Sequence, residues 1–397
     1  MKKVKAETRL PYLPGGIVVH ILAKLPVKSL LQFRCVSKYW RSLISDPKFN
    51  LSTQKEQVVV MSMPILQSKY QKSALVHVIC DEASMKVLPL PNPLRGPYYN
   101  DLPDLRGSCN GLVLVSYDQD LFLWNPSTRW CIKVLSHWCL GKYRQGSSFI
   151  SGLCYDSSTG DYKAIMVSRA CNFAMVGSFG NKTWTEIHFP YTDRILESGP
   201  TTNDRTHWLV HRGEDLHSQV MHNLIVSFDP QMNDFVEMPV PQNERIKRNI
   251  VHGFGVLGGC LSLALTSVHE GRKVTSVEVF AMRKYGDEAS WTSLFIISDL
   301  ILWNPGYTSV VSLCSTTNGE VLFLWEGEGG VMAYNPERNS YRCVKSRSCR
   351  VYCITSFSES VVSPPCCNWE TEDYTVISLS GPMQKYNTRR PGVALSK

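Results

Sequence analysis

The chain has 397 residues, 43% of them apolar, and a formal net charge of +8. This length and composition allow a small module and one large domain with a sizeable core. A membrane-spanning helix is excluded, because no apolar run reaches about eighteen residues. The basic residues at the N-terminus are not followed by an apolar stretch, so we expect no secretory signal.

The positive charge is unevenly distributed along the chain. Basic residues exceed acidic residues by three in residues 1–12, by five in residues 13–50 and by four in residues 381–397. Set against the total of +8, these excesses leave a net charge of −4 on residues 51–380. A mildly acidic main domain argues against a surface that binds nucleic acid.

The fourteen cysteines do not form a pattern typical of a disulfide framework or a zinc site. Cys343, Cys349 and Cys353 are spaced too irregularly for paired zinc knuckles, and Cys366 is adjacent to Cys367. We therefore expect free, mostly buried thiols, no metal and a reducing compartment, which is the cytoplasm, the nucleus or both.

Residues 13–49 have the pattern of three short helices in a row. The first helix carries apolar residues at helical spacing on one face, namely Ile17, Ile21, Leu22 and Leu25. Pro26 ends this helix. A segment of about forty residues rarely buries enough apolar surface to fold alone, so we expect another domain or another protein to cover it.

The second and third helices follow directly. The second contains Leu30, Leu31 and Phe33. Ser37 is placed to cap the third helix, whose apolar residues are Trp40, Leu43 and Ile44. This helix ends at Asp46, because a residue that precedes a proline is pushed out of helical geometry.

Four stretches of this segment match a known family in register: Leu13–Pro14, residues 25–30 (LPVKSL), residues 33–38 (FRCVSK) and residues 40–49 (WRSLISDPKF). Together they resemble the F-box of plant proteins. One departure is Gly15–Gly16, where many members of the family have acidic residues. Glycine lacks the favourable interaction of an acid with the helix dipole, so the first helix is expected to start late or to fray.

The resemblance implies that the segment docks on a Skp1-like adaptor, an acidic protein that suits the basic charge of residues 13–50. Adaptor-facing residues, carried over by position, would be Leu13, Pro14, Ile17, Ile21, Leu22, Leu25, Pro26, Leu30, Leu31, Phe33, Val36, Trp40 and Ile44. Some of them must pack the module's own core instead, and the sequence does not separate the two sets.

The rest of the chain has the pattern of many short strands joined by similar turns. Runs such as Val58–Met61 and Leu75–Ile79 are rich in β-branched residues, and the proline-rich stretch Leu88–Pro93 indicates a loop. Aromatic residues then flank a turn in Trp124–Trp130, Phe228–Phe235, Tyr334–Tyr341 and, without the proline, Tyr155–Tyr162. Asn or Asp before Pro favours a tight turn, and the flanking aromatics can pair across the hairpin.

Recurrence of this pattern at a few tens of residues predicts an all-β repeat architecture, most simply a β-propeller of six or seven blades. A large irregular sandwich or barrel is the alternative. We expect four segments: a flexible basic N-terminus (1–12), the helical module (13–50), the propeller (51–380) and a disordered basic tail (381–397).

Several motifs of the large domain also match a family. They are Gly107–Leu112 (GSCNGL), Leu123–Pro126 (LWNP), Thr206–Leu209 (THWL), Gly258–Leu261 (GGCL) and the Met282 to Trp291 turn. They resemble the F-box-associated interaction region of plant F-box/kelch-type proteins, a superfamily that includes the S-locus F-box proteins. The resemblance covers about residues 105–345.

Motifs of catalysis are not found: the sequence has no P-loop, no G-x-S-x-G and no H-E-x-x-H. The densest histidine group is His207, His211, His217 and His222. His207 and His211 could share a face of one strand, but no cysteine or acidic residue stands at matching spacing. We therefore expect no catalytic residue, no metal and no cofactor.

The two resemblances imply the substrate-recognition subunit of an SCF-type ubiquitin ligase. The F-box would bind a Skp1-like adaptor and through it cullin and RING subunits, while the propeller would hold a target protein that the sequence does not identify. Two alternatives remain: a non-degradative scaffold or carbohydrate-binding propeller, and a propeller enzyme, which would need a convergent acid or metal cluster. No nucleic acid or membrane is expected as a partner.

Overall fold

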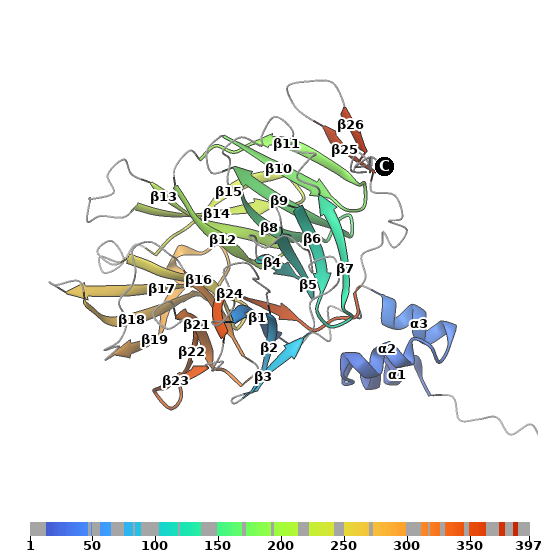
Figure 1. Ribbon diagram of the computed structural model, residues 1–397, viewed down its shortest axis with the longest axis horizontal. Coiled ribbons are helices and arrows are strands. Elements are labelled where there is room, and N and C mark those ends of the chain that lie inside the picture. Colours follow the sequence, from blue (N-terminus) through green and yellow to red (C-terminus); the bar gives the residue numbers. More distant parts are fainter. Residues whose placement is uncertain are drawn as a thin grey trace, which may run out of the picture.

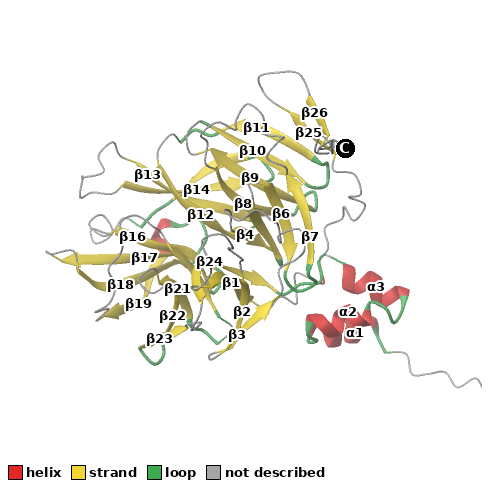
Figure 2. Ribbon diagram, viewed as in Figure 1, coloured by secondary structure: helices red, strands yellow, loops and turns green. Residues whose placement is uncertain are grey.

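The protein has two parts, a group of three helices and a much larger all-β domain (Figures 1 and 2). The structure is a computed structural model and describes residues 13–46, 49, 56–64, 75–81, 84–88, 103–117, 120–135, 149–168, 172–191, 194–212, 222–241, 250–269, 273–298, 311–316, 318–325, 330–344, 349–362, 373–377 and 384–387. No helix among these residues is long and apolar enough to cross a membrane.

The three helices are α1 (Gly15–Ala23), α2 (Val27–Phe33) and α3 (Lys38–Ser45). Prolines at the N-caps of α1 and α2 start both helices, since they preset φ and their missing N–H is not needed there. Ser37 caps α3 as predicted, with its Oγ accepting from the Trp40 N–H at 3.1 Å. The predicted late start of α1 is wrong, because the helix begins at Gly15, directly after Pro14.

The large domain is built from units of four antiparallel strands, or blades; two of these blades are joined into one eight-stranded sheet by parallel pairing of their first strands, from Gly253↔Val311 to Gly255↔Leu313. Blade 1 contains β4 (Asp104–Cys109), β5 (Leu112–Tyr117), β6 (Asp120–Asn125) and β7 (Trp130–Leu135). Blade 2 contains β8 (Phe149–Asp156), β9 (Asp161–Ser168), β10 (Phe173–Ser178) and β11 (Thr183–His188). Blade 3 contains β12 (Arg194–Thr202), β13 (Arg205–Arg212), β14 (His222–Asp229) and β15 (Asp234–Met238).

The other three blades complete the set. Blade 4 contains β16 (Ile250–Leu257), β17 (Cys260–His269), β18 (Lys273–Met282) and β19 (Trp291–Ser298), with the 3-10 turn η3 (Glu288–Ser290) before its last strand. Blade 5 contains β20 (Val311–Ser315), β21 (Val321–Trp325), β22 (Gly330–Asn335) and β23 (Ser340–Val344). Blade 6 contains β24 (Cys349–Ser358), β1 (Glu56–Pro64), β2 (Leu75–Asp81) and β3 (Ser84–Leu88).

The first strand of each blade lies at the centre of a ring. These strands contact one another in the order β4, β8, β12, β16, β20 and β24, and β24 returns to β4. The ring is closed within blade 6, where β24 from the far end of the chain pairs antiparallel with β1, from Glu56↔Ser358 to Pro64↔Cys349. Figure 1 shows β1 beside β24. The described residues thus form a six-bladed propeller, which narrows the prediction of six or seven blades.

The turns repeat the same chemistry in different blades. At the turn before the last strand of blades 1, 3 and 5, the side-chain oxygen of Asn125, Asp229 or Asn335 accepts backbone N–H groups two or three residues further on. Each turn ends in a left-handed residue: Arg129, Asn233 or Asn339. Such Asx turns need no distant contacts, which explains why the turns are readable from the sequence.

The aromatic residue that precedes each of these turns is buried, as predicted. Trp124, Phe228 and Tyr334 are at most 2% exposed. Their partners differ, because Phe228 faces Phe235 and Tyr334 faces Tyr341, whereas Trp124 faces Cys131 and not Trp130. The Phe228 and Phe235 ring centroids are 5.3 Å apart, an edge-to-face contact.

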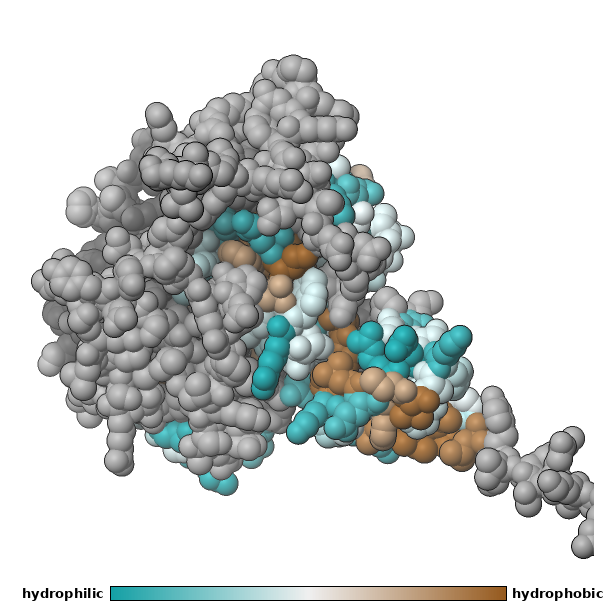
Figure 3. All heavy atoms as spheres, turned by 45° about the vertical axis from the view of Figure 1, so that its right-hand side comes forward, coloured by the Kyte–Doolittle hydropathy of each residue, from teal (hydrophilic) through white to brown (hydrophobic). Residues whose placement is uncertain are grey.

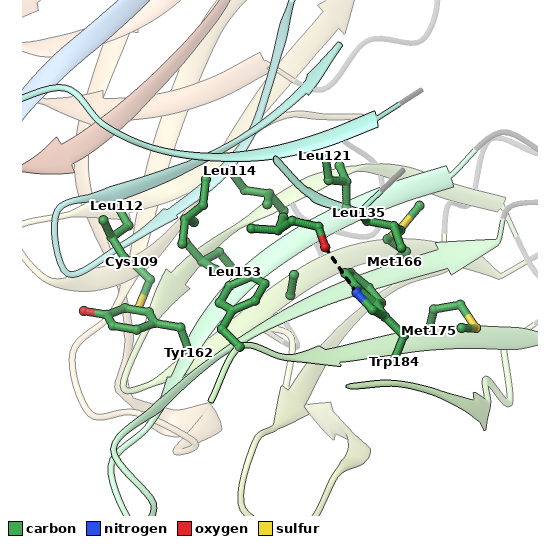
Figure 4. Packing of buried hydrophobic residues seen from close by; sticks show 14 of the residues in the cluster. Cys109, Leu112, Leu114, Leu121, Leu135, Leu153, Tyr162, Met166, Met175 and Trp184 are labelled. Carbon is green, nitrogen blue, oxygen red and sulfur yellow. Dashed lines mark hydrogen bonds between the residues drawn. The ribbon is translucent and has the colours of Figure 1, made fainter. Parts of the chain in front are cut away.

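The core lies between neighbouring blades and is therefore divided into several clusters. Figure 4 shows the cluster between blades 1 and 2, in which Leu114 and Leu135 of blade 1 meet Leu153 and Met166 of blade 2. The Trp184 indole N–H donates to the Val134 carbonyl across the two blades, at 3.4 Å. Each blade is thus stabilised by the neighbours that cover its apolar faces.

Two further strands follow β24 in the chain, and one of them lies where the sequence predicts a disordered tail. β25 (Asp373–Ile377) pairs in parallel with β11 at the outer edge of blade 2, and β26 (Gln384–Asn387) pairs with β25. β26 lies within residues 381–397, for which the sequence predicts disorder, so for these four residues the structure has a strand instead. Three predicted segments lie outside the described residues: the rest of that tail, residues 1–12 and the loop after Leu88.

Replacing Trp124, Phe228 or Tyr334 by alanine is expected to lower the free energy of unfolding by about 3–5 kcal/mol each, because each change leaves a cavity between strands. Denaturant unfolding followed by tryptophan or circular dichroism signals measures the effect. Tyr341→Ala is the matched control, since this tyrosine sits in the same hairpin as Tyr334 but is 45% exposed. If all three alanine variants unfolded at the same denaturant concentration as the wild-type protein, these aromatics would not stabilise the blades.

Candidate functional site

The helical module has a small core of its own. Leu22 of α1, Leu30 of α2 and Ile44 of α3 are at most 2% exposed and pack with Phe49 and with Val361, a residue from the far end of the propeller. The sequence placed Leu22, Leu30 and Ile44 among the adaptor-facing residues. The structure places these three in the part of that set that packs the module's own core, because a partner cannot reach them while the three helices keep this packing.

Other apolar residues of the module face outward. Leu13 is 56% exposed, Ile17 48%, Ile21 49% and Val36 63%. Ile17 and Ile21 are one helical turn apart on α1 and so share a face. Figure 3 shows hydrophobic residues gathered on the surface of the helical module. Apolar side chains that a module this small leaves exposed mark a surface for another protein.

The remaining predicted residues lie between these two groups. Pro14 and Pro26 are exposed, whereas Leu25, Leu31, Phe33 and Trp40 are half-buried against the core. The rings of Phe33 and Trp40 meet edge to face, with centroids 5.2 Å apart. Leu25, Leu31, Phe33 and Trp40 therefore pack against the core while part of the surface of each remains accessible.

Sequence reasoning missed Tyr39, which is 53% exposed on α3. A Cβ atom on Gly15 would lie 3.2 Å from the Tyr39 hydroxyl, so this tyrosine reaches the start of α1. The absence of a side chain at Gly15 therefore leaves room for the Tyr39 hydroxyl. Tyr39 directly precedes Trp40, whose side chain packs against the core, so on a helical wheel the Tyr39 side chain points away from the core. This position in the helical pattern could have identified Tyr39 from the sequence.

The surface of the module is basic. Lys24, Lys28, Lys38 and Arg41 are exposed, and the first turn of each helix lacks acidic residues. An apolar face surrounded by positive charge favours a partner with an apolar patch and acidic residues around it.

His207, which belongs to the densest histidine group of the sequence, is a buried residue that links two blades. Its Nδ1 lies 3.1 Å from the Pro200 carbonyl oxygen and its Nε2 lies 2.8 Å from the Tyr285 hydroxyl, which links blade 3 to blade 4. Burial lowers the pKa of His207 to about 4. The side chains of His211, His217 and His222 lie outside the described residues, and the described part of the chain contains no cluster of metal-ligating side chains.

Other buried polar groups also serve the fold. The Lys163 ammonium lies 3.1 Å from the Asp156 carboxylate and donates to Asn233 Oδ1 at 3.0 Å, which joins blades 2 and 3. Burial by itself would raise the pKa of Asp156, but hydrogen bonds from Ser158, Lys163 and Thr159 outweigh it and lower the pKa to about 2. Burial raises the pKa of the Cys109 and Cys154 thiols, which makes them unreactive.

Comparison with protein families identifies both parts of the chain. Residues 99–369 match the profile of the F-box associated beta propeller domain, and residues 9–52 match that of the F-box domain. The chain belongs to the F-box associated beta propeller family. Its helical module is the F-box, so the resemblance found in the sequence is confirmed.

Named relatives come from the same family. The F-box/kelch-repeat protein At3g23880 of Arabidopsis thaliana is 28% identical over 355 residues, which cover 85% of this chain and 91% of the relative. The F-box protein CPR1 of the same plant is 28% identical over 320 residues, or 72% of this chain and 73% of the relative.

Solved structures resemble the chain only weakly. Virginiamycin B lyase from Staphylococcus aureus is 9% identical and covers 78% of this chain and 100% of its own, with a TM-score of 0.37. A likeness of that size carries no argument about the function of this F-box protein.

The low pKa of His207 predicts a pH dependence of stability. The unfolded chain takes up this proton near pH 6.5 and the folded chain only near pH 4, so acidification favours the unfolded state between these values. Stability should fall by up to about 1.4 kcal/mol per pH unit through this residue. Urea unfolding from pH 7 to pH 4 measures the slope, and His207→Gln should reduce it. Equal slopes in both proteins would contradict the assignment.

Proposed function

We propose that this F-box protein is the substrate-recognition subunit of an SCF-type ubiquitin ligase. An F-box implies a Skp1-type partner in general. Here the F-box would dock on a Skp1-like adaptor, cullin and RING subunits would follow through that adaptor, and the propeller would hold the target. The chain itself would supply no catalytic residue. This activity belongs in the cytoplasm or nucleus.

The observation that carries the proposal is the division of the F-box into a core and an exposed apolar face. Leu22, Leu30 and Ile44 complete the core, and Ile17 and Ile21 are left half exposed on α1. Burying an exposed apolar side chain of this size contributes about 1–2 kcal/mol. A docking partner gains this free energy without unfolding the module.

The proposed contribution to ubiquitination is positional. A target held on the propeller and an adaptor held on the F-box are brought into one assembly, which turns a bimolecular encounter with a charged conjugating enzyme into a nearly intramolecular one. The geometry agrees with separate surfaces, because the helices lie beside the propeller in Figure 2 and do not cover the ring.

The double substitution Ile17→Asp with Ile21→Asp is expected to weaken capture by a Skp1-like adaptor at least about a hundredfold, because it places unpaired charges in an apolar interface. Binding of the purified full chain to the immobilised adaptor measures it. Both positions are exposed, so the fold should survive, whereas Leu30→Asp would place a charge in the core and unfold the module.

Met232→Asp is the matched control, since it makes the same kind of change at an exposed apolar residue of blade 3. It should bind like wild type. A wild-type chain that fails to bind the adaptor, or a double variant that binds equally well, would rule out the docking surface. Affinity purification with the proteasome inhibited then distinguishes a degradative subunit, whose bound protein accumulates with ubiquitin, from a scaffold, whose bound protein does not.

A further inference from the structure

The F-box core contains a residue that is more than three hundred positions away in sequence. Val361 follows β24, is 2% exposed and packs with Leu22, Leu30, Ile44 and Phe49. The F-box core is therefore completed by a side chain that the propeller part of the chain delivers, in line with the expectation that another part of the protein covers this module.

The segment that carries Val361 is fixed by blade 1. Asn125 is fully buried, and its Nδ2 donates to the carbonyl oxygens of Ser360 at 3.2 Å and Val362 at 2.8 Å. The Ser360 N–H donates to Ser127 Oγ at 3.3 Å. The two carbonyls that Asn125 holds are those on either side of Val361, so the Asn-Pro turn of blade 1 sets the position of this valine.

A second turn of blade 1 lies against the same segment. A Cβ atom on Gly111 would come within 2.0 Å of Ser360 Oγ and 2.6 Å of the Ser358 carbonyl oxygen, and the φ of Gly111 is +84°. Both facts require glycine. The segment after β24 is therefore contacted by two of the sequence motifs, residues 107–112 and residues 123–126, which together fix its position.

Val361 and Val362 serve different parts of the protein. Val361 packs in the F-box core, whereas Val362 packs against the cluster between blades 1 and 2. These adjacent valines thus connect the two hydrophobic cores directly. They also provide matched positions at which the same substitution affects one core and not the other.

The strand that leads into this segment is the one that closes the propeller. β24 pairs with β1 and contacts β4 and β20, and Ser358 at its end lies opposite Glu56 at the start of β1. The strand that follows the F-box in the chain, β1, therefore begins beside the end of β24, close to the segment that carries Val361. Val361 reaches the F-box only when β24 is in place between its neighbours.

We propose that closure of the propeller completes the F-box, so that the adaptor is bound tightly only by a chain whose ring is closed. The inference rests on the proposed function for its adaptor and deepens it by naming what controls the docking module. A core of a few residues depends strongly on each of them. Loss of Val361, or release of the segment that holds it, opens the three helices, and an incompletely folded subunit does not enter the ligase.

The test uses full-length variants and measures amide hydrogen exchange in residues 15–45, together with binding to an immobilised Skp1-like adaptor. Val361→Ala should speed exchange across the three helices roughly tenfold, as expected for the loss of two buried methyl groups, and weaken adaptor binding. Val362→Ala is the control and should speed exchange in blades 1 and 2 while leaving the helices at the wild-type rate.

A second pair of variants tests whether a residue of blade 1, outside the F-box core, positions Val361 in that core. Asn125→Ala removes the side-chain hydrogen bonds to Ser360 and Val362 and should speed exchange in residues 15–45, although Asn125 belongs to blade 1. Asn335→Ala makes the same change in the equivalent turn of blade 5, where the side chain accepts from the Arg338 N–H. This control should leave the helices unchanged.

The outcomes separate this inference from the proposed function. Faster exchange in the helices for Val361→Ala and Asn125→Ala, but for neither control, supports the coupling whether or not the adaptor binds. Wild-type exchange in the helices of Val361→Ala overturns it. An adaptor that fails to bind the wild-type chain contradicts the proposed function alone, because the exchange measurement does not involve the adaptor.

Discussion

The pairing of β24 with β1 is the interaction on which the rest of the structure depends. It joins two ends of the large domain that are on the order of 300 residues apart, and the entropic cost of closing such a loop grows only slowly with its length. In return, strands that would otherwise present unpaired edges become neighbours within blade 6. The strand β24 that takes part in this pairing also contacts β20 and β4, and so completes the ring of inner strands.

Between these ends the blades are held by local repetition and by contacts with the next blade. Asx turns shape the outer hairpins of blades 1, 3 and 5, and apolar clusters fill the spaces between blades. Polar links such as Lys163 to Asn233 and His207 to Tyr285 cross the same boundaries, where a buried polar group must find a partner to avoid a large desolvation cost. These buried polar groups therefore link neighbouring blades and are explained by the fold.

The F-box shows how a module too small to be self-sufficient is maintained. Its three helices bury only a few side chains, and the propeller adds Val361 to them. With the core supported in this way, α1 can leave Ile17 and Ile21 exposed for a partner. Under the proposed function, the buried face of this short helix serves stability, to which the propeller contributes, and its exposed face serves binding.

The sequence by itself determined everything that depends on near neighbours. The cap at Ser37, the Asx turns, the burial of Trp124, Phe228 and Tyr334 and the division into helices and blades all follow from spacing within a few residues, as does the resemblance to the F-box. Tertiary structure alone decided which apolar residues of α1 face inward: the sequence predicts one shared face for Ile17, Ile21 and Leu22, but Leu22 is buried while Ile17 and Ile21 are about half exposed. It also decided the strand at 384–387, the closing pair β1 and β24, and the place of Val361, since these contacts join residues whose separation in sequence leaves no local signal.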